Sequence, residues 1–240
     1  MVPVGRQEAA FLGAAARKRA FDLVLASVLL VMLMPLVVVI ALAIKLDSRG
    51  PVLYRCRRAG RHGVEFAMLK FRKMHDGAGG AMLTAADDAR FTRVGRVLAR
   101  TKLDEVPQLF NVLKGKMSLV GPRPEDPAFV ELDPKKFAVA LRVRPGNTGL
   151  SQLAFARESE ILDPADRVGH YVGVILTQKL ALDRLYATRR TIRMDLSILA
   201  WTVFTVAGRR DVAVNRSTGK LTRRVRRPPS TVTVESSRAA

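Results

Sequence analysis

LVLASVLLVMLMPLVVVIALAI, residues 23–44, contains no charged side chain. As a helix that rises about 1.5 Å per residue, this run could cross the roughly 30 Å hydrocarbon core of a bilayer. It is too long and starts too late for a signal peptide, and no small-residue cleavage site ends it, so we expect it to remain attached. Asp22, at its entrance, is costly in lipid and requires Arg19 or a backbone donor as a partner.

Pro35 predicts that this helix bends or breaks at Met34–Pro35, because proline removes a backbone donor and clashes with the preceding turn. Basic residues flank the run on both sides: Arg17, Lys18, Arg19, Lys45, Arg49, Arg55, Arg57 and Arg58. Since basic loops stay cytoplasmic, a single crossing would place one cluster on the wrong side. A re-entrant membrane helix over residues 17–46, which enters and leaves by one face, satisfies both clusters. A simple signal anchor that tolerates its proline is the alternative.

The chain has 240 residues and a formal net charge of +20. This length predicts one main domain, and the charge predicts an anionic partner: nucleic acid, phospholipid headgroups or a phosphorylated substrate. Cys56 is the only cysteine, which excludes an internal disulfide and a zinc site built on paired cysteines. Residues 1–16 are expected to form an N-terminal arm, residues 47–208 a cytoplasmic domain, and residues 209–240 a basic, disordered tail.

The domain reads as α/β and rich in helices. Alternating residues at Val52–Arg55 and Glu65–Phe71, around a Gly60–Gly63 turn, predict a small β-hairpin. Residues 75–90 are rich in Gly, Ala and Asp and predict a loop. MDLSILAWTVFTVAG, residues 194–208, is too short for a second crossing and predicts an interfacial amphipathic or buried helix. The expected fold is therefore a compact, membrane-associated, monotopic domain.

TKLDEVPQLFNVLKGKMSLVGPRPE, residues 101–125, places two neighbouring carboxylates before an apolar helix. Pro107 fits only the first turn of that helix, which should therefore begin near Asp104. There the helix dipole keeps a carboxylate ionised and also attracts phosphate. Asp104 could be a capping acid and nothing more. Glu105 lies about a hundred degrees further around the helix, so we expect the two acids to have different roles.

Basic side chains near these acids predict phosphate binding. Arg100 lies one turn before them, and Arg123 is held on a rigid turn whose other members are Gly121, Pro122 and Pro124. Arg144 precedes Pro145 in a second turn of this kind, and the two guanidinium groups could form one anion clamp. Lys70 and Arg72, at the end of the predicted hairpin, complete the candidate phosphate-binding set.

Four stretches together resemble the bacterial sugar transferase family, the monotopic polyprenyl-phosphate phosphoglycosyl transferases. They are KRAFDLVLASVLLVMLMP, LKFRKM, DDARFTRVGRVLARTKLDEVPQLFNVLKGKMSLVGPRP and RPGNTGLSQ, in a match that runs in order from Arg19 to Gly208. Many relatives have Ser at the position of Met34, Thr at that of Lys73 and Ile at that of Asn147. These departures leave the fold and the carboxylate pair intact.

The resemblance implies an enzyme that moves a sugar 1-phosphate from a UDP-sugar to a polyprenyl phosphate such as undecaprenyl phosphate, with release of UMP. It implies a catalytic pair at Asp104 and Glu105 and a Mg²⁺ ion bound by that pair. Our hypothesis is that Asp104 attacks phosphorus and forms a covalent intermediate. Glu105 either binds or orients the metal or takes a proton. The helix broken at Pro35 also matches the family.

The implied location is the bacterial inner membrane, with the catalytic domain on the cytoplasmic face. The reaction would be the first membrane step in the assembly of a polysaccharide, such as an exopolysaccharide, or of another glycoconjugate. The expected partners are the UDP-sugar, the polyprenyl phosphate and the phospholipid membrane; the oligomeric state is left open, a homodimer included.

Two alternatives come from other functional classes. A membrane-tethered protein could bind nucleic acid through its basic tail. Three tyrosines and one tryptophan offer few stacking platforms, however, and no recognition motif is present, so no nucleic acid is expected as a partner. A membrane scaffold could keep the same fold without chemistry, but the intact acidic pair between two Arg-Pro turns argues against it.

Overall fold

The computed structural model describes residues 4–79, 88–163, 165–208 and 211–224. The α-helices are α1 (Val4–Asp47), α2 (Arg93–Thr101), α3 (Gln108–Leu113), α4 (Pro127–Leu132), α5 (Pro134–Phe137), α6 (Leu150–Ala154), α7 (Glu158–Ile161), α8 (Arg167–His170), α9 (Leu176–Arg189) and α10 (Ile192–Gly208). The strands are β1 (Leu53–Ala59), β2 (Glu65–Phe71), β3 (Ser118–Val120), β4 (Gly146–Thr148), β5 (Val212–Val214) and β6 (Leu221–Arg223). Short 3-10 turns η1 (Arg61–Gly63), η2 (Leu103–Glu105) and η3 (Ala140–Arg142) and the π-helical turn η4 (Tyr171–Ile175) complete the fold. The predicted α/β, helix-rich architecture is confirmed.

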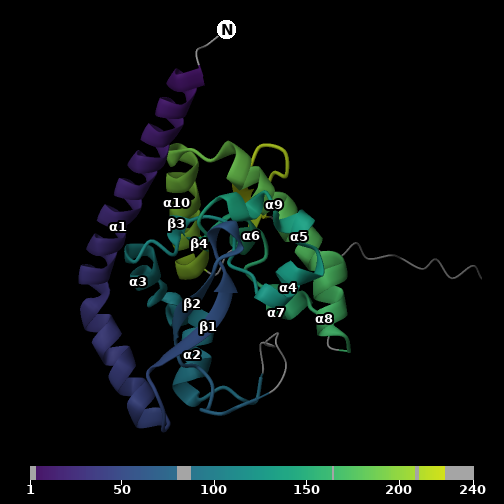
Figure 1. The fold of residues 1–240 in the computed structure, drawn as a ribbon. Helices are drawn as coiled ribbons and strands as arrows, with labels where there is room; N and C mark the ends of the chain where they lie inside the picture. The colour runs from purple at the N-terminus through teal and green to yellow at the C-terminus, as the bar shows by residue number, and fades with distance from the viewer. Residues whose placement is uncertain (1–3, 80–87, 164, 209–210, 225–240) are drawn as a thin grey trace, which may run out of the picture.

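Helix α1 runs along one side of the domain and bends part-way along its length (Figure 1). It continues through Pro35 to Asp47, so a division into two helices at Met34–Pro35 is not found. Proline is the usual cause of such a bend. The helix persists beyond it because Leu36 and Ile40 pack against the domain. The predicted arm is likewise not a separate segment, since α1 already begins at Val4.

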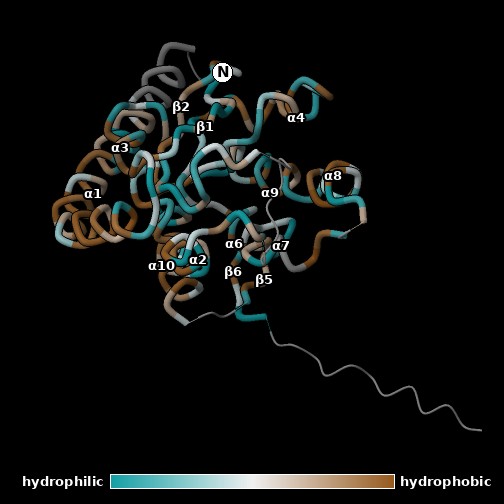
Figure 2. The backbone as a smooth tube through the Cα atoms, turned by 90° about the horizontal axis from the view of Figure 1, so that it is seen from below, coloured by the Kyte–Doolittle hydropathy of each residue, from teal (hydrophilic) through white to brown (hydrophobic). Residues whose placement is uncertain are grey.

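The apolar part of α1 has two different faces. Ala26, Leu30 and Ile44 are buried against the domain, whereas Val31 and Met32 are each 73% exposed. By length and composition the stretch Gly13–Asp47 could cross a membrane, and an 18-residue window within it has a mean hydropathy of 3.1. Hydrophobic residues run along α1 and α10, which lie together on the side of the molecule opposite α8 (Figure 2). An apolar face that the domain does not cover suits contact with lipid.

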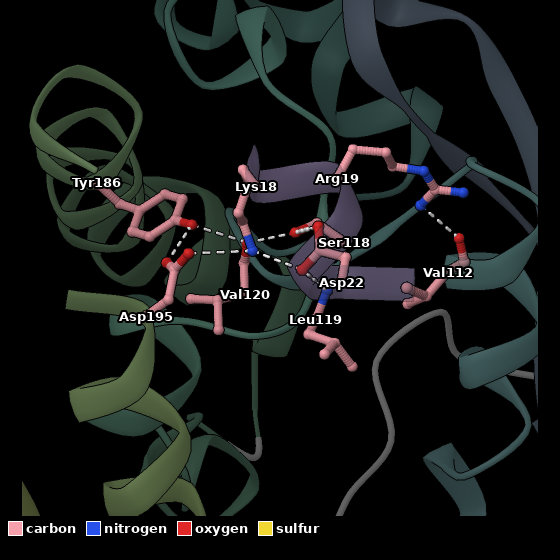
Figure 3. A network of polar contacts seen from close by, with 9 residues as sticks. All are labelled: Lys18, Arg19, Asp22, Val112, Ser118, Leu119, Val120, Tyr186 and Asp195. Carbon is pink, nitrogen blue, oxygen red and sulfur yellow. Dashed lines mark hydrogen bonds and ion pairs between the residues drawn. The ribbon is translucent and has the colours of Figure 1, made fainter. Parts of the chain in front are cut away.

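A buried polar network fastens α1 to the domain (Figure 3). The Asp22 carboxylate accepts hydrogen bonds from Lys18 Nζ at 2.6 Å, from the Ser118 hydroxyl at 2.8 Å and from the Leu119 backbone N–H at 3.3 Å. The predicted backbone donor is therefore present. Arg19 is not the partner, because its guanidinium donates to the carbonyl groups of Val112 and of its neighbour in α3. Those carbonyls end a helix and lack partners within it.

The same network reaches α10. Lys18 Nζ lies 3.1 Å from the carboxylate of Asp195, and the Tyr186 hydroxyl lies 2.7 Å from the other oxygen of that carboxylate. Burial raises the pKa of Asp195, while Lys18 and Tyr186 act in the opposite direction. Lys18 therefore contacts Asp22 within α1 and Asp195 in α10, and so links the two helices. Buried ionic groups of this kind are strongly destabilising when one partner is removed.

The predicted hairpin is confirmed. Strands β1 and β2 pair antiparallel from Leu53↔Phe71 to Ala59↔Glu65, and the turn between them begins at Gly60. Helix α3 is fixed to the other edge of β2 by Asn111, whose side chain accepts a hydrogen bond from Leu69 N–H at 2.9 Å and donates one to Ala67 C=O at 2.8 Å. This contact determines how the end of β2 faces the carboxylate pair.

Strands β3 and β4 pair in parallel and join the two Arg-Pro turns. Gly121 N–H donates to Thr148 C=O at 2.9 Å, and Gly146 N–H donates to Pro122 C=O at 2.8 Å. A Cβ atom on Gly121 would come within 2.7 Å of the Gly146 nitrogen, and one on Gly146 within 2.0 Å of the Gly121 nitrogen. Both glycines are therefore required by the close approach of two backbones.

The C-terminal segment differs from the expected disordered tail. Strands β5 and β6 form an antiparallel hairpin, and Val212 and Leu221 are buried in the main core. The prediction was wrong for residues 211–224, because basic residues hid a short alternating apolar pattern; residues 225–240 lie outside the described residues. Of the predicted loop over residues 75–90, the structure describes the two ends, which are joined by a hydrogen bond from His75 N–H to Arg90 C=O at 3.0 Å.

Asp22→Ala should lower the free energy of unfolding by roughly 2 to 4 kcal/mol, since it leaves buried donors without an acceptor. Thermal and urea unfolding in detergent micelles would measure this loss. Glu65→Ala is the matched control: it removes the exposed Arg57–Glu65 ion pair and should cost less than about 1 kcal/mol. Equal losses in the two variants would contradict an anchoring role for Asp22.

Candidate active site

One large cleft of about 2490 Å³ opens between β2, η2, α6, α10 and the Arg123 turn. Its polar wall includes Lys70, Glu105 and Arg123. Its apolar wall is formed by α1 and α10, through Leu25, Leu29, Leu33, Leu196, Leu199 and Val203. The volume exceeds that of an ordinary small-molecule pocket, which is about 300 to 1,000 Å³. A charged ligand and an apolar chain could therefore lie in the same cleft.

The carboxylate pair (Asp104 and Glu105) lies in turn η2, directly before α3. The predicted helix start near Asp104 is close to the observed one, but α3 itself begins at Gln108 with Pro107 as its N-cap. No side-chain hydrogen bond caps either η2 or α3, so the alternative of Asp104 as a mere capping acid has no support in the described residues. Asp104 is 2% exposed.

Glu105 is held by Lys70, the last basic residue of β2. Lys70 Nζ lies 2.7 Å from Glu105 Oε1. Burial raises the pKa of Glu105, but the charges of Lys70 and Arg123 outweigh burial and hold this pKa well below its usual range. Glu105 is consequently ionised at neutral pH and a weak base.

Asp104 has a different lysine. Lys73 Nζ lies 3.4 Å from Asp104 Oδ2, and it also lies 5.7 Å from the ring centroid of Phe91. Lys73 was not predicted as a site residue. Its position directly after Lys70 and Arg72 was a signal, but sequence alone does not indicate which of three neighbouring cations points at which acid.

Lys102 is a second cation that the sequence did not reveal. It has φ 60°, the left-handed region, where a residue with a side chain is strained. Burial lowers its pKa, against the opposing effect of Glu105. Lys102 lines the cleft immediately before the carboxylate pair, so strain is stored next to the candidate reacting groups.

Arg123 is available for a ligand. Among the described residues, its guanidinium donates no hydrogen bond and forms no ion pair within 4 Å, although it lines the cleft. Burial lowers its pKa, but the carboxylates of Glu105, Glu158 and Glu125 have the larger combined effect and raise it. A permanently charged, planar donor group without close partners is suited to a phosphate.

A buried ionic cluster supports the Arg123 turn from behind. Lys179, 1% exposed, lies 3.0 Å from both Glu125 and Glu158 and donates a hydrogen bond to the Tyr171 hydroxyl at 2.7 Å. The sequence analysis missed this cluster, although a Lys179–Asp183 pair within an otherwise apolar part of α9 was a usable signal. Such pairs are expected inside a protein only when they are fully partnered.

Asp183 completes this support. It accepts a hydrogen bond from the Ser151 hydroxyl at 2.7 Å and one from the backbone N–H of Arg123. Burial raises the pKa of Asp183 to about 7, against the effect of these two hydrogen bonds. Its carboxyl therefore fixes the backbone from which the Arg123 side chain projects.

The structure does not bring every predicted residue into the cleft. Arg144 Nε donates to Gly115 C=O at 2.9 Å, and this residue does not line the cleft, so the expected clamp of two guanidinium groups is not formed. Arg72 lines the cleft, but its guanidinium donates to the carbonyls of Arg49 and, at 2.8 Å, of Ser48. It therefore closes the C-terminal end of α1. Arg100 is exposed at the rim, and Pro124 lines the cleft beside Arg123.

Gly121 and Pro122 act through their backbones. They hold the Arg123 turn against β4, as described above, and neither lines the cleft.

The predicted metal ligands are two neighbouring carboxylates, which are hard oxygen donors. Within the described part of the chain, no group of three or more His, Cys, Asp or Glu residues could hold a metal ion. Mg²⁺ commonly takes one or two carboxylates and completes its shell with water and substrate phosphates. Asp104 and Glu105 fit that mode of binding and do not fit a site made of protein ligands alone.

The profile of the bacterial sugar transferase family matches residues 13–209. The UDP-glucose:undecaprenyl-phosphate glucose-1-phosphate transferase of Caulobacter vibrioides is 40% identical over 193 residues, which cover 78% of this chain and 68% of that protein. The undecaprenyl-phosphate glucose phosphotransferase of Komagataeibacter xylinus is 40% identical over 195 residues, covering 78% and 35%.

A third relative differs in its sugar. The UDP-N-acetylgalactosamine-undecaprenyl-phosphate N-acetylgalactosaminephosphotransferase of Aeromonas hydrophila is 37% identical over 182 residues, covering 73% of this chain and 43% of that protein. The match thus spans between 35% and 68% of the length of these three relatives.

Asp183 predicts a pH dependence of stability. The folded state keeps this proton up to about pH 7, whereas an unfolded chain releases it near pH 4, so stability falls as pH rises from 4 to 7. Asp183→Asn cannot ionise and still accepts hydrogen bonds. Its free energy of unfolding relative to the wild type should rise by roughly 1 to 4 kcal/mol between pH 5 and pH 8. Urea unfolding at each pH would measure this; parallel pH profiles would contradict the assignment.

Proposed function

This chain belongs to the bacterial sugar transferase family, and on that premise we propose that it transfers a sugar 1-phosphate from a UDP-sugar to polyprenyl phosphate and releases UMP. The observation that carries the proposal is the cleft itself. One wall presents the ionised carboxylate of Glu105 together with Arg123, and the other presents leucines of α1 and α10. The first wall suits a nucleotide diphosphate and the second the apolar chain of a lipid carrier.

The proposed reaction has two displacements at one phosphorus atom. A carboxylate oxygen of Asp104 attacks the sugar-bearing phosphorus; an O–P bond forms, and the bond to UMP breaks with its electron pair on the leaving phosphate. An oxygen of the carrier phosphate then attacks the same phosphorus and releases the Asp104 carboxylate. Splitting the transfer lets a soluble donor and a lipid acceptor occupy the cleft in turn.

Arg123 has the role of binding the donor phosphates. Within the described part of the chain, its guanidinium has no hydrogen-bond or ion-pair partner that a ligand would have to displace. The Lys179 cluster and Asp183 hold its turn in place. Preorganised donors of this kind stabilise charge that develops on a leaving phosphate. Lys70, whose Nζ lies 2.7 Å from Glu105, adds positive charge to the cleft.

Glu105 is more suited to holding a cation or a substrate group than to removing a proton, because its pKa is held low by Lys70 and Arg123 after burial is overcome. Magnesium, bound by Asp104 and Glu105, would supply charge neutralisation for the diphosphate. The chain itself contributes the orientation of both carboxylates through β2 and α3.

We further propose that α1 holds the domain at the cytoplasmic face of the bacterial inner membrane. The exposed face of α1 and the apolar face of α10 would then lie in lipid, with the cleft at headgroup height. Basic residues at both ends of the apolar run favour a helix that enters and leaves on one side. A nucleic-acid-binding role and an inactive scaffold receive no support from the family match.

Asp104→Asn should abolish transfer, with a loss of at least about 1,000-fold in UMP release from UDP-sugars in the presence of Mg²⁺ and polyprenyl phosphate. Donor alone should add the mass of one sugar phosphate to the wild-type chain and none to the variant. Asp133→Asn, at the N-cap of α5, keeps its cap and should retain wild-type turnover. Substantial transfer by a correctly folded Asp104→Asn protein would exclude this residue as the nucleophile.

Arg123 and Arg144 offer a direct comparison of the two Arg-Pro turns. Arg123→Met should raise the KM for the UDP-sugar by about 10- to 100-fold, since one charge-assisted phosphate contact is lost. Arg144→Met should change that KM by no more than about twofold, because its guanidinium donates to Gly115 outside the cleft. Similar increases in KM in both variants would instead support the clamp expected from the sequence, in which both guanidinium groups bind phosphate. Thermal unfolding of each variant would identify losses caused by misfolding.

A further inference from the structure

Lys73 has a backbone that cannot move far. Its carbonyl accepts a hydrogen bond from Thr92 N–H, at the start of α2, at 3.1 Å. Gly95 approaches the same carbonyl so closely that a Cβ atom there would lie 1.9 Å from the oxygen. The first turn of α2 therefore packs directly on the Lys73 peptide group. A side chain that starts from so fixed a point has a limited range of positions.

The Lys73 ammonium group contacts both an aromatic ring and the candidate nucleophile. The ring centroid of Phe91 lies 5.7 Å from Nζ, and Asp104 Oδ2 lies 3.4 Å from it. The side chain of Lys73 is 27% exposed and lines the cleft, whereas that of Asp104 is 3% exposed and does not. Lys73 is thus a charged side chain that both lines the cleft and contacts the Asp104 carboxylate.

The neighbouring acid does not compete for this lysine. Glu105 has its own cation, Lys70, at 2.7 Å. Lys102 contributes further positive charge, with no ion pair within 4 Å recorded for it in the described residues. Each carboxylate of the pair therefore has a separate lysine, and the Lys73 contact belongs to Asp104 alone.

We propose that Lys73 is the counter-ion of residue 104 through both halves of the transfer, an inference that rests on the proposed function. Before the reaction the carboxylate carries one negative charge. When its oxygen bonds to phosphorus and UMP departs, the carboxyl becomes a neutral acyl group, and the attached phosphoryl group carries one negative charge in its place. The ammonium keeps one anion to neutralise throughout, and it need only move from a carboxylate oxygen to a phosphoryl oxygen.

This role has a kinetic consequence for both half-reactions. The donor diphosphate and the acceptor phosphate are both anions, and each must approach an anionic centre. A fixed ammonium reduces that repulsion and stabilises the charge on the transferred group. Lys73→Met should slow formation of the adduct and its transfer to polyprenyl phosphate by about 10- to 100-fold each. Lys73→Arg should retain more activity than Lys73→Met, and Lys135→Met, an exposed lysine of α5, should equal the wild type.

A chemical rescue separates charge from structure. Lys73→Cys is prepared in a Cys56→Ala background, which removes the only native thiol. Treatment with bromoethylamine then rebuilds an ammonium group on residue 73 within an already folded protein. The modified protein should recover at least about 10-fold in both rates relative to the untreated one. The adduct is followed by intact mass and rapid quench with UDP-sugar alone, and the second step by adding polyprenyl phosphate.

The outcomes are distinguishable. If the Cys56→Ala protein with native Lys73 forms no adduct with donor alone, the covalent route of the proposed function fails. If it forms the adduct, wild-type rates in Lys73→Met would overturn the role of Lys73, as would a modified Lys73→Cys protein that stays as slow as the untreated one. Rescue of both rates by the rebuilt ammonium would establish that role.

Discussion

The buried carboxylate of Asp22 is the constraint on which the arrangement of this protein depends. It comes directly before the uncharged run of α1, and its bonds to Lys18, Ser118 and the Leu119 backbone fix that helix to β3. A carboxylate without these partners would be too costly at the edge of a bilayer. Because α1 also supplies leucines to one wall of the cleft, the same contact fixes the helix to the domain and positions that wall.

Charge in the cleft is distributed according to a simple pattern. Lys70 forms an ion pair with Glu105, and Lys73 forms one with Asp104. Lys179 forms ion pairs with two carboxylates behind the Arg123 turn. The guanidinium of Arg123 is near several acids, but no ion pair within 4 Å is recorded for it in the described part of the chain. Paired charges fix geometry, whereas a charge without a close partner attracts a ligand. The large positive net charge of the chain is therefore less informative about the site than Arg123, a cleft-lining cation for which the described residues provide no ion pair within 4 Å.

Sequence reasoning predicted the features that depend on local pattern. The uncharged run, the hairpin, the position of the carboxylate pair and the rigid Arg123 turn follow from residues close together in the chain. Sequence reasoning failed where the site depends on the direction of a side chain. An Arg-Pro pattern restricts the backbone but does not determine where the guanidinium points. Arg144 thus turns to Gly115, and the cations that contact the acidic pair could be assigned only from the fold. The hairpin over residues 211–224 was missed because its apolar residues are few and its surroundings strongly basic.

The burial of Asp104 bears on why transfer would proceed through a covalent intermediate. An acyl phosphate is consumed by water unless water is kept away, and Asp104, the proposed nucleophile, is 2% exposed and lies where bulk water is largely excluded. Lys73 reduces the free-energy cost of burying the Asp104 carboxylate, and its ammonium group also lies near the Phe91 ring. A polar donor can leave and an apolar acceptor can enter through the same cleft only if the intermediate survives the exchange. Burial and a fixed counter-ion are together the physical conditions for that survival.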